Sequence, residues 1–219
     1  MEIKVNEKLQ KMVLEDKSDG KRWLFVGNSI IDGCYHTFGK LNFSGVFRER
    51  VVWECRRVND IVINSSFGGG MVTARVIREF PDRVALFKPH VAFLLLGAND
   101  AMSKVTLETF TENMRKLADM FQEIGCYLVL MNGLPAWGDV GFPNKEFAQT
   151  VCQVAEEKGT GLIDNYSIWE NESRLPYLMS DSLHPNAYGH LKMGQDMFRY
   201  MGIWDENSTI CRLDCGLGL

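Results

Sequence analysis

The stretch WLFVGNSIIDG, Trp23 to Gly33, contains an apolar run that ends abruptly at Gly27 and is followed by the polar pair Asn28-Ser29. Similar short runs recur along the chain, at 22–27, 60–66, 91–97, 126–133 and 161–165. Nearly continuous apolar runs of this length are typical of strands that a parallel sheet buries on both faces. The sequence therefore predicts five buried strands, of which the run at 22–27 is the first.

Helical patterns alternate with these runs. The clearest spans 106–124, where apolar residues recur at three- and four-residue spacing, at Leu107, Phe110, Met114, Leu117, Phe121 and Ile124. Weaker patterns cover 44–58, 71–79, 144–158 and 187–202, and 5–16 is expected to form an extra N-terminal helix. Strands that alternate with helices predict an α/β fold, a three-layer α/β/α sandwich with a five-stranded parallel sheet and right-handed crossovers, of flavodoxin-like type.

The composition places limits on the class of protein. A chain of 219 residues suits one domain over 1–219, with 1–21 as the N-terminal extension and 203–219 as a C-terminal tail. The net charge of −4 argues against a nucleic-acid partner. No run approaches the roughly 18 apolar residues of a membrane span. The charged N-terminus lacks the apolar core of a signal peptide, so a cytoplasmic location is expected.

The six cysteines are expected to be reduced thiols. Most lie inside apolar or helical patterns, where a free cysteine behaves as a small hydrophobic residue. Cys211 and Cys215 have a C-x3-C spacing, but no second Cys or His pair follows nearby to complete a zinc site. No metal and no cofactor are expected.

Unusual residues gather where the predicted strands end. These segments are Gly27-Asn28-Ser29, NSSFGGG at 64–70, GAND at 97–100, and DSLHPNAYGH at 181–190 before the last helix. Each has a structural explanation as a turn or a helix cap. Ligand sites of parallel α/β sheets, however, lie beyond the carboxyl ends of the strands, so the segments are expected to meet there.

Together these segments contain the groups that acyl transfer requires. A serine such as Ser29 is a poor nucleophile until a base takes its proton, and His184 is the best candidate for that base. Asp181, three residues earlier, is placed to orient the imidazole. The tetrahedral intermediate needs preorganised donors, for which the Ser29 N–H, a glycine N–H from 68–70 and the Asn99 amide are candidates.

The four segments, in this order, resemble the SGNH or GDSL-like family of serine esterases and acyl hydrolases, over roughly 22–202. The resemblance implies the α/β/α fold and a site whose residues are Ser29 as nucleophile, His184 as base, Asp181 as its orienting acid, and Ser29, Gly69 and Asn99 as the oxyanion hole. Gly68 and Gly70 adjoin Gly69, so this register is open by one residue. The sequence departs from the family's usual Gly-Asp-Ser at Asn28, a change we expect to be tolerated.

Neighbouring families fit less well. Ile31 stands where the α/β-hydrolase elbow needs its second glycine, and the 68–70 loop lacks the Lys-Ser/Thr of a phosphate-binding loop. The expected reaction is hydrolysis of a short-chain acyl ester, such as an O-acetylated carbohydrate, through an acyl-enzyme. The alternatives are a lysophospholipase or thioesterase, and a non-catalytic module that binds a ligand on the same fold. The oligomeric state does not follow from the sequence.

Substrate specificity is expected to lie in the loops that follow the strands. Trp137 in the loop 133–142 and Tyr35 in the loop 32–40 are candidate substrate-binding residues, because aromatic rings stack on sugars or acyl chains. The remaining histidines lack a partner in sequence. His36 is interpreted as an ordinary loop residue with substrate contact as the alternative, His90 as structural, and His190 as a packing or solvent-exposed residue of the last helix.

Overall fold

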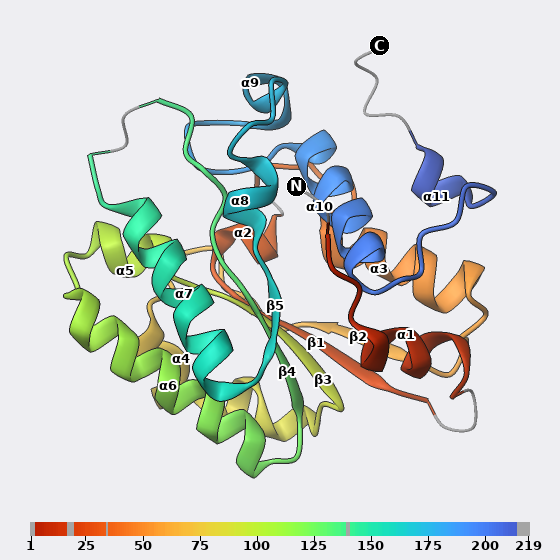
Figure 1. Ribbon diagram of the computed structural model, residues 1–219, viewed down its shortest axis with the longest axis horizontal. Coiled ribbons are helices and arrows are strands. Elements are labelled where there is room, and N and C mark those ends of the chain that lie inside the picture. The colour runs from red at the N-terminus through yellow and green to blue at the C-terminus, as the bar shows by residue number, and fades with distance from the viewer. Residues whose placement is uncertain (1–2, 17–19, 34, 139–140, 214–219) are drawn as a thin grey trace.

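The computed structural model describes residues 3–16, 20–33, 35–138 and 141–213. Five strands form one sheet in the order β2-β1-β3-β4-β5, and every neighbouring pair is parallel. The strands are β1 (Arg22–Gly27), β2 (Ile61–Asn64), β3 (Val91–Leu95), β4 (Tyr127–Met131) and β5 (Gly161–Ile163). The predicted α/β fold with a five-stranded parallel sheet is therefore confirmed (Figure 1).

Helices cover both faces of the sheet (Figure 1). One face packs against α1 (Glu7–Leu14), α3 (Phe43–Arg48) and α10 (Ala187–Tyr200), and the other against α4 (Thr73–Arg83), α6 (Leu107–Glu123) and α7 (Asn144–Lys158). Successive strand residues alternate between the two cores, since Phe25 faces the first and Leu24 and Val26 face the second. This double burial explains why the central strands β1, β3 and β4 are almost entirely apolar.

Some elements differ from the sequence prediction. The edge strand β2 is not buried as expected, because it has a neighbour on one side only and Ile61 is 55% exposed. The helix predicted over 44–58 is two elements, α3 and a π-helical turn η1 (Glu49–Glu54). The ends of the α6 stripe, Leu107 and Ile124, are also exposed rather than core-facing.

Several short elements were not predicted, because each has at most five residues and an apolar repeat cannot be recognised over so short a stretch. They are α2 (Ser29–Asp32), the 3-10 turn η2 (Ala85–Phe87), α5 (Ala98–Met102), α8 (Asn165–Trp169), α9 (Leu175–Leu178) and α11 (Thr209–Arg212). Two of them, α2 and α5, begin within three residues of the ends of strands that lead to the candidate site. α11 lies within the segment that was expected to be a tail.

The described cysteines Cys55, Cys126, Cys152 and Cys211 are free thiols, whereas Cys34 and Cys215 lie outside the described residues. Burial raises the pKa of Cys126 to about 12, so its thiol stays protonated and unreactive. No described helix is both long enough and apolar enough to span a bilayer.

Candidate active site

Ser29 is the first residue of α2, and only Asn28 separates it from the end of β1. Glycine is required at position 27, because a Cβ there would lie 2.2 Å from the carbonyl oxygen of Leu95 on the neighbouring strand β3. Asn28 is buried, and its side-chain oxygen accepts a hydrogen bond from the Ile30 N–H at 3.0 Å. Asn28 is thus the N-cap of α2, a role that asparagine fills as well as aspartate. The Asn28 side chain thereby fixes the turn that presents Ser29.

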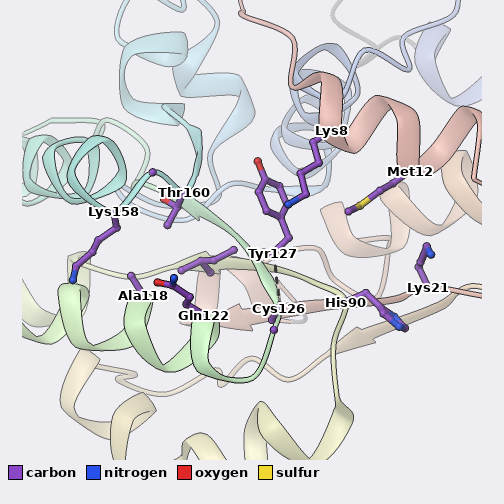
Figure 2. Close-up of a pocket in the computed structure, with 13 residues that line it drawn as sticks. Lys8, Met12, Lys21, His90, Ala118, Gln122, Cys126, Tyr127, Lys158 and Thr160 are labelled. Carbon is purple, nitrogen blue, oxygen red and sulfur yellow. Dashed lines mark hydrogen bonds between the residues drawn. The ribbon is translucent and has the colours of Figure 1, made fainter.

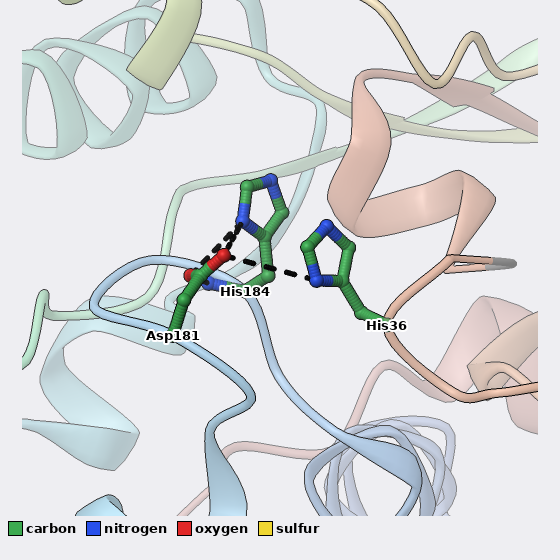
Figure 3. Close-up of side chains that lie close together, drawn as sticks. All are labelled: His36, Asp181 and His184. Atoms are coloured by element: carbon green, nitrogen blue, oxygen red, sulfur yellow. Dashed lines mark hydrogen bonds and ion pairs between the residues drawn. The ribbon is translucent and has the colours of Figure 1, made fainter.

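His184 and Asp181 lie in the loop between α9 and α10, and His184 reaches Ser29 beyond the end of β1. The Nε2 atom of His184 is 2.8 Å from the Ser29 Oγ, although the two residues are 155 positions apart. The Nδ1 atom of the same ring is 2.9 Å from Asp181 Oδ2 (Figure 3). The isolated bridge between Met179 and Pro185 closes the base of this loop. The structure therefore brings the three residues into one hydrogen-bonded line.

The Asp181 carboxylate is held from several sides. Its Oδ1 atom accepts the backbone N–H groups of Leu183 at 2.8 Å and His184 at 2.7 Å. Partial burial acts to raise the pKa of Asp181, but these bonds and the His184 ring outweigh it and hold that pKa below its usual value. The ionised carboxylate is thus the stable form beside the His184 Nδ1–H, and it keeps Nε2 available as an acceptor for the serine proton.

The glycine loop follows β2 and runs beside the end of β1. The backbone N–H groups of Ser65 and Phe67 donate to the carbonyl oxygens of Phe25 at 2.8 Å and Gly27 at 3.1 Å, which extends the strand pairing into the loop. Gly69 is exposed, and no atom lies within 4 Å of the position that its Cβ would occupy. Gly70 has a positive φ (60°), whereas Gly69 does not. Open space beside Gly69 is compatible with a ligand there.

Asn99 lies in α5, after β3. Its amide nitrogen donates to the Met71 carbonyl oxygen at 3.1 Å, which fixes the orientation of the amide and uses one of its two hydrogens. The neighbouring Asp100 is fully buried and accepts the Thr73 N–H at 3.0 Å and the Thr73 hydroxyl at 2.6 Å. Asp100 therefore ties α5 to the start of α4.

The two candidate substrate-binding aromatics are exposed. Trp137 is 51% exposed, and its backbone N–H donates to the Ser182 carbonyl oxygen at 2.8 Å, which anchors its loop beside the Asp181 segment. Tyr35 is 81% exposed, and Phe38, on the same loop, is 84% exposed. Their contact with a substrate stays a prediction.

His36 is the residue whose position the sequence did not predict. Its ring lies flat on the His184 ring, with 3.8 Å between centroids and 6° between planes. Its Nδ1 atom is 2.8 Å from the Ser180 Oγ and 3.8 Å from Asp181 Oδ2 (Figure 3). His36 is therefore more than an ordinary loop residue. No spacing rule could have found it, because 144 positions separate it from Ser180.

His36, Asp181 and His184 also have the donor types of a metal site, with ligand atoms within 4.8 Å of one another. An imidazole binds a metal along a lone pair in its ring plane. Because the two rings are stacked and parallel, their lone pairs do not converge on a common point. The arrangement therefore suits two stacked rings, each hydrogen-bonded to its own neighbours, better than a shared ion.

His190 lies in α10 with no exposed surface, so packing and not solvent exposure describes it. Its Nδ1 atom accepts the Phe43 N–H at 3.2 Å, and its Nε2 atom has no hydrogen-bond partner among the described residues. Burial, with smaller contributions from His36 and His184, lowers the pKa of His190 to about 3. The ring is thus neutral in the folded protein.

This shift predicts a pH-dependent stability. Between pH 6.5 and about 3 the unfolded chain binds a proton at His190 that the folded protein does not, so stability is lost as the pH falls through this window. The wild type should lose up to about 1.4 kcal/mol per pH unit more than His190→Asn, whose amide oxygen can replace Nδ1 as the acceptor. Urea unfolding of both proteins across the window measures this difference. Parallel pH curves would contradict the assignment.

A cavity of about 500 Å³ lies at the opposite edge of the sheet, at the amino ends of β1, β3, β4 and β5 (Figure 2). Three lysines line it, but their charges are already compensated. Lys158 pairs with Asp119 and Lys21 with Asp16, each at 2.8 Å, and the Lys8 ammonium lies 4.0 Å from the centre of the Tyr127 ring. This cavity contains none of the candidate catalytic residues.

Known structures share this fold. A protein from Parabacteroides merdae, described as a GDSL-like lipase, is 20% identical, with 91% of this chain and 99% of that chain covered and a TM-score of 0.75. Axe2, an acetylxylan esterase from Geobacillus stearothermophilus, is 18% identical, with coverage of 92% and 97% and a TM-score of 0.71. At these identities the similarity shows the fold alone.

The sequence itself identifies the family. No curated protein matches the chain. The GDSL-like lipase/acylhydrolase family, in contrast, matches residues 25–192, which include Ser29, the glycine loop, Asn99, Asp181 and His184. The match covers well over half of the sequence and agrees with the fold of both solved structures. The chain therefore belongs to the GDSL-like lipase/acylhydrolase family.

Proposed function

We propose that the protein is a serine esterase that hydrolyses short-chain acyl esters through an acyl-enzyme. The observation that carries this proposal is the continuous hydrogen-bonded line from Ser29 Oγ to His184 Nε2 at 2.8 Å and from His184 Nδ1 to Asp181 at 2.9 Å. A nucleophile beside a base that a third group orients is the arrangement that acyl transfer requires.

The reaction follows from this geometry in two halves. His184 takes the Ser29 proton as Oγ attacks the ester carbonyl, and Asp181 stabilises the resulting imidazolium. The Ser29 N–H, the Gly69 N–H and the second N–H of Asn99 bind the oxyanion. His184 then gives its proton to the leaving alkoxide. A water molecule, activated by the same ring, attacks the acyl-enzyme and releases the acid and Ser29.

We further propose an O-acetylated carbohydrate as the substrate class. Axe2, which has the same fold, is an acetylxylan esterase, and variants of a serine, an aspartate and a histidine of that protein are described as catalytic mutants. Its histidine lies three residues after the aspartate, as His184 follows Asp181. The exposed rings of Tyr35 and Trp137 offer surfaces on which sugar rings stack.

The experiment that tests the function compares p-nitrophenyl acetate, p-nitrophenyl palmitate and an acetylated xylo-oligosaccharide as substrates. A fluorophosphonate probe, followed by peptide mass spectrometry, identifies the residue that reacts. We expect labelling at Ser29, and faster hydrolysis of both acetyl esters than of the palmitate. A preference for palmitate would favour a lysophospholipase or thioesterase instead. Absence of both labelling and turnover would favour a non-catalytic ligand-binding module.

Replacing Asn99 tests the oxyanion hole. Asn99→Ala should lower kcat roughly 100- to 1000-fold with little change in KM, because the lost donor binds the charge that develops in the transition state. Asn113→Ala is the matched control, since its amide donates to the Thr73 hydroxyl at 3.0 Å and is not aimed at the substrate. Steady-state kinetics on p-nitrophenyl acetate measure both variants. Near-normal turnover of Asn99→Ala would show that another group stabilises the oxyanion.

A further inference from the structure

His36 repeats the orientation of His184 beside it. The two rings are parallel and stacked, and each turns its Nδ1 atom toward Asp181, at 2.9 Å from His184 and 3.8 Å from His36. Figure 3 shows the other nitrogen of each ring on the side away from the carboxylate. For His184 that nitrogen is the Nε2 atom that meets Ser29, so His36 directs a second Nε2 toward the same side of the site.

The hydrogen bonds around Ser180 favour one tautomer of His36. The Ser180 hydroxyl donates to the His184 carbonyl oxygen at 3.2 Å, so its oxygen acts as the acceptor toward His36 Nδ1 at 2.8 Å. Neutral His36 therefore carries its proton on Nδ1, and its Nε2 atom is a hydrogen-bond acceptor. The Asp181 carboxylate favours the same tautomer, because it attracts the Nδ1–H.

The surroundings of His36 lower its pKa, so the ring is neutral at neutral pH and its Nε2 atom remains an acceptor. Burial lowers the pKa of His36 and the neighbouring His184 acts in the same direction, while Asp181 and Asp32 oppose them. Buried His190 also faces it from α10, and the Tyr35 ring packs against its edge at 5.3 Å between centroids. The side chain is only 14% exposed, so the ring is held in one orientation.

The leaving group of the ester meets His184 Nε2, which protonates it. An acceptor beside that atom lies next to the alcohol part of the substrate. We propose that His36 is a specificity-determining residue whose Nε2 atom accepts a hydrogen bond from a hydroxyl group on the carbon adjacent to the ester-bearing carbon. The protein would thus favour esters of polyols over esters of simple alcohols. This inference rests on the proposed function, and it assigns the recognition of the alcohol to a residue outside the line from Ser29 to Asp181.

The test uses two acetate esters that differ in a single donor. 2-Hydroxyethyl acetate has the adjacent hydroxyl group, and 2-methoxyethyl acetate replaces it with an ether that cannot donate. The wild type should prefer the first by about tenfold in kcat/KM, the effect of one hydrogen bond made in the transition state. His36→Phe keeps a flat ring against His184 but has no acceptor, so the preference should fall to about one. His36→Gln, which places an amide near the Nε2 position, should recover part of it.

The outcomes separate this inference from the proposed function. A purely structural role for His36 would make His36→Phe lower the rates of both esters equally and leave their ratio unchanged, which would overturn the inference. An equal wild-type rate on the two esters would also overturn it. If Ser29→Ala hydrolyses both esters as fast as the wild type, the proposed function itself fails. The expected result is a ratio that falls in His36→Phe because kcat/KM for the hydroxyl ester drops more than kcat/KM for the methoxy ester.

Discussion

Ser29→Ala is expected to lower kcat for p-nitrophenyl acetate by roughly 10⁶-fold, as loss of the nucleophile does in other serine hydrolases. The size of the effect follows from the chemistry, because no acyl-enzyme forms without the Oγ atom that lies 2.8 Å from His184. A small residual rate over water should remain from the oxyanion donors and substrate binding. The structure should be unaffected, since Ser29 follows a cap that Asn28 provides.

Ser182→Ala is the matched control for this variant. Ser182 lies in the same loop as Asp181, and its contact with Trp137 uses the backbone carbonyl oxygen and not the hydroxyl. We expect this variant to keep wild-type turnover and fluorophosphonate labelling, whereas Ser29→Ala loses both. If Ser29→Ala kept more than about one hundredth of the wild-type kcat, a different residue would have to be the nucleophile.

The strands were predictable because parallel sheets impose a simple pattern. Burial on both faces makes β1, β3 and β4 almost entirely apolar, and such runs can be recognised without knowing which strand lies beside them. The edge strand β2 departs from the pattern because its outer side has no neighbour. The prediction of a single helix over 44–58 was wrong for a different reason. Apolar spacing does not distinguish an α-helix from the π-helical turn of 49–54.

The candidate site was predictable where it depends on strand ends, since topology alone brings these together. Ser29, Asn99 and the glycine loop all follow strands, and Asp181 and His184 precede a helix packed against the same sheet. The role of Asp100 was not predictable, because its partner Thr73 lies 27 positions away. The stacking of His36 on His184 likewise depends on tertiary contacts and leaves no periodic signal in the sequence.

Asp181→Asn is expected to lower kcat by about 10⁴-fold while leaving the loop intact, because the change reverses one hydrogen bond. Asp181 Oδ1 accepts two backbone N–H groups, and only the amide oxygen of asparagine can replace it there. The amide nitrogen then takes the place of Oδ2, 2.9 Å from His184 Nδ1. It donates to that atom, so the ring proton moves to Nε2 and the imidazole no longer accepts the proton of Ser29.

Thermal unfolding and steady-state kinetics of Asp181→Asn, measured together, distinguish a change in the His184 tautomer from a disruption of the loop. An unchanged Tm with the large loss of kcat is the expected result, since the backbone hydrogen bonds to Oδ1 persist. Asp32→Asn is the control, because it removes another carboxylate near His36 without touching His184, and it should keep kcat within the same order of magnitude. If Asp181→Asn retained about a tenth or more of the wild-type kcat, Asp181 would be a cap of its loop and His184 would work without an orienting acid.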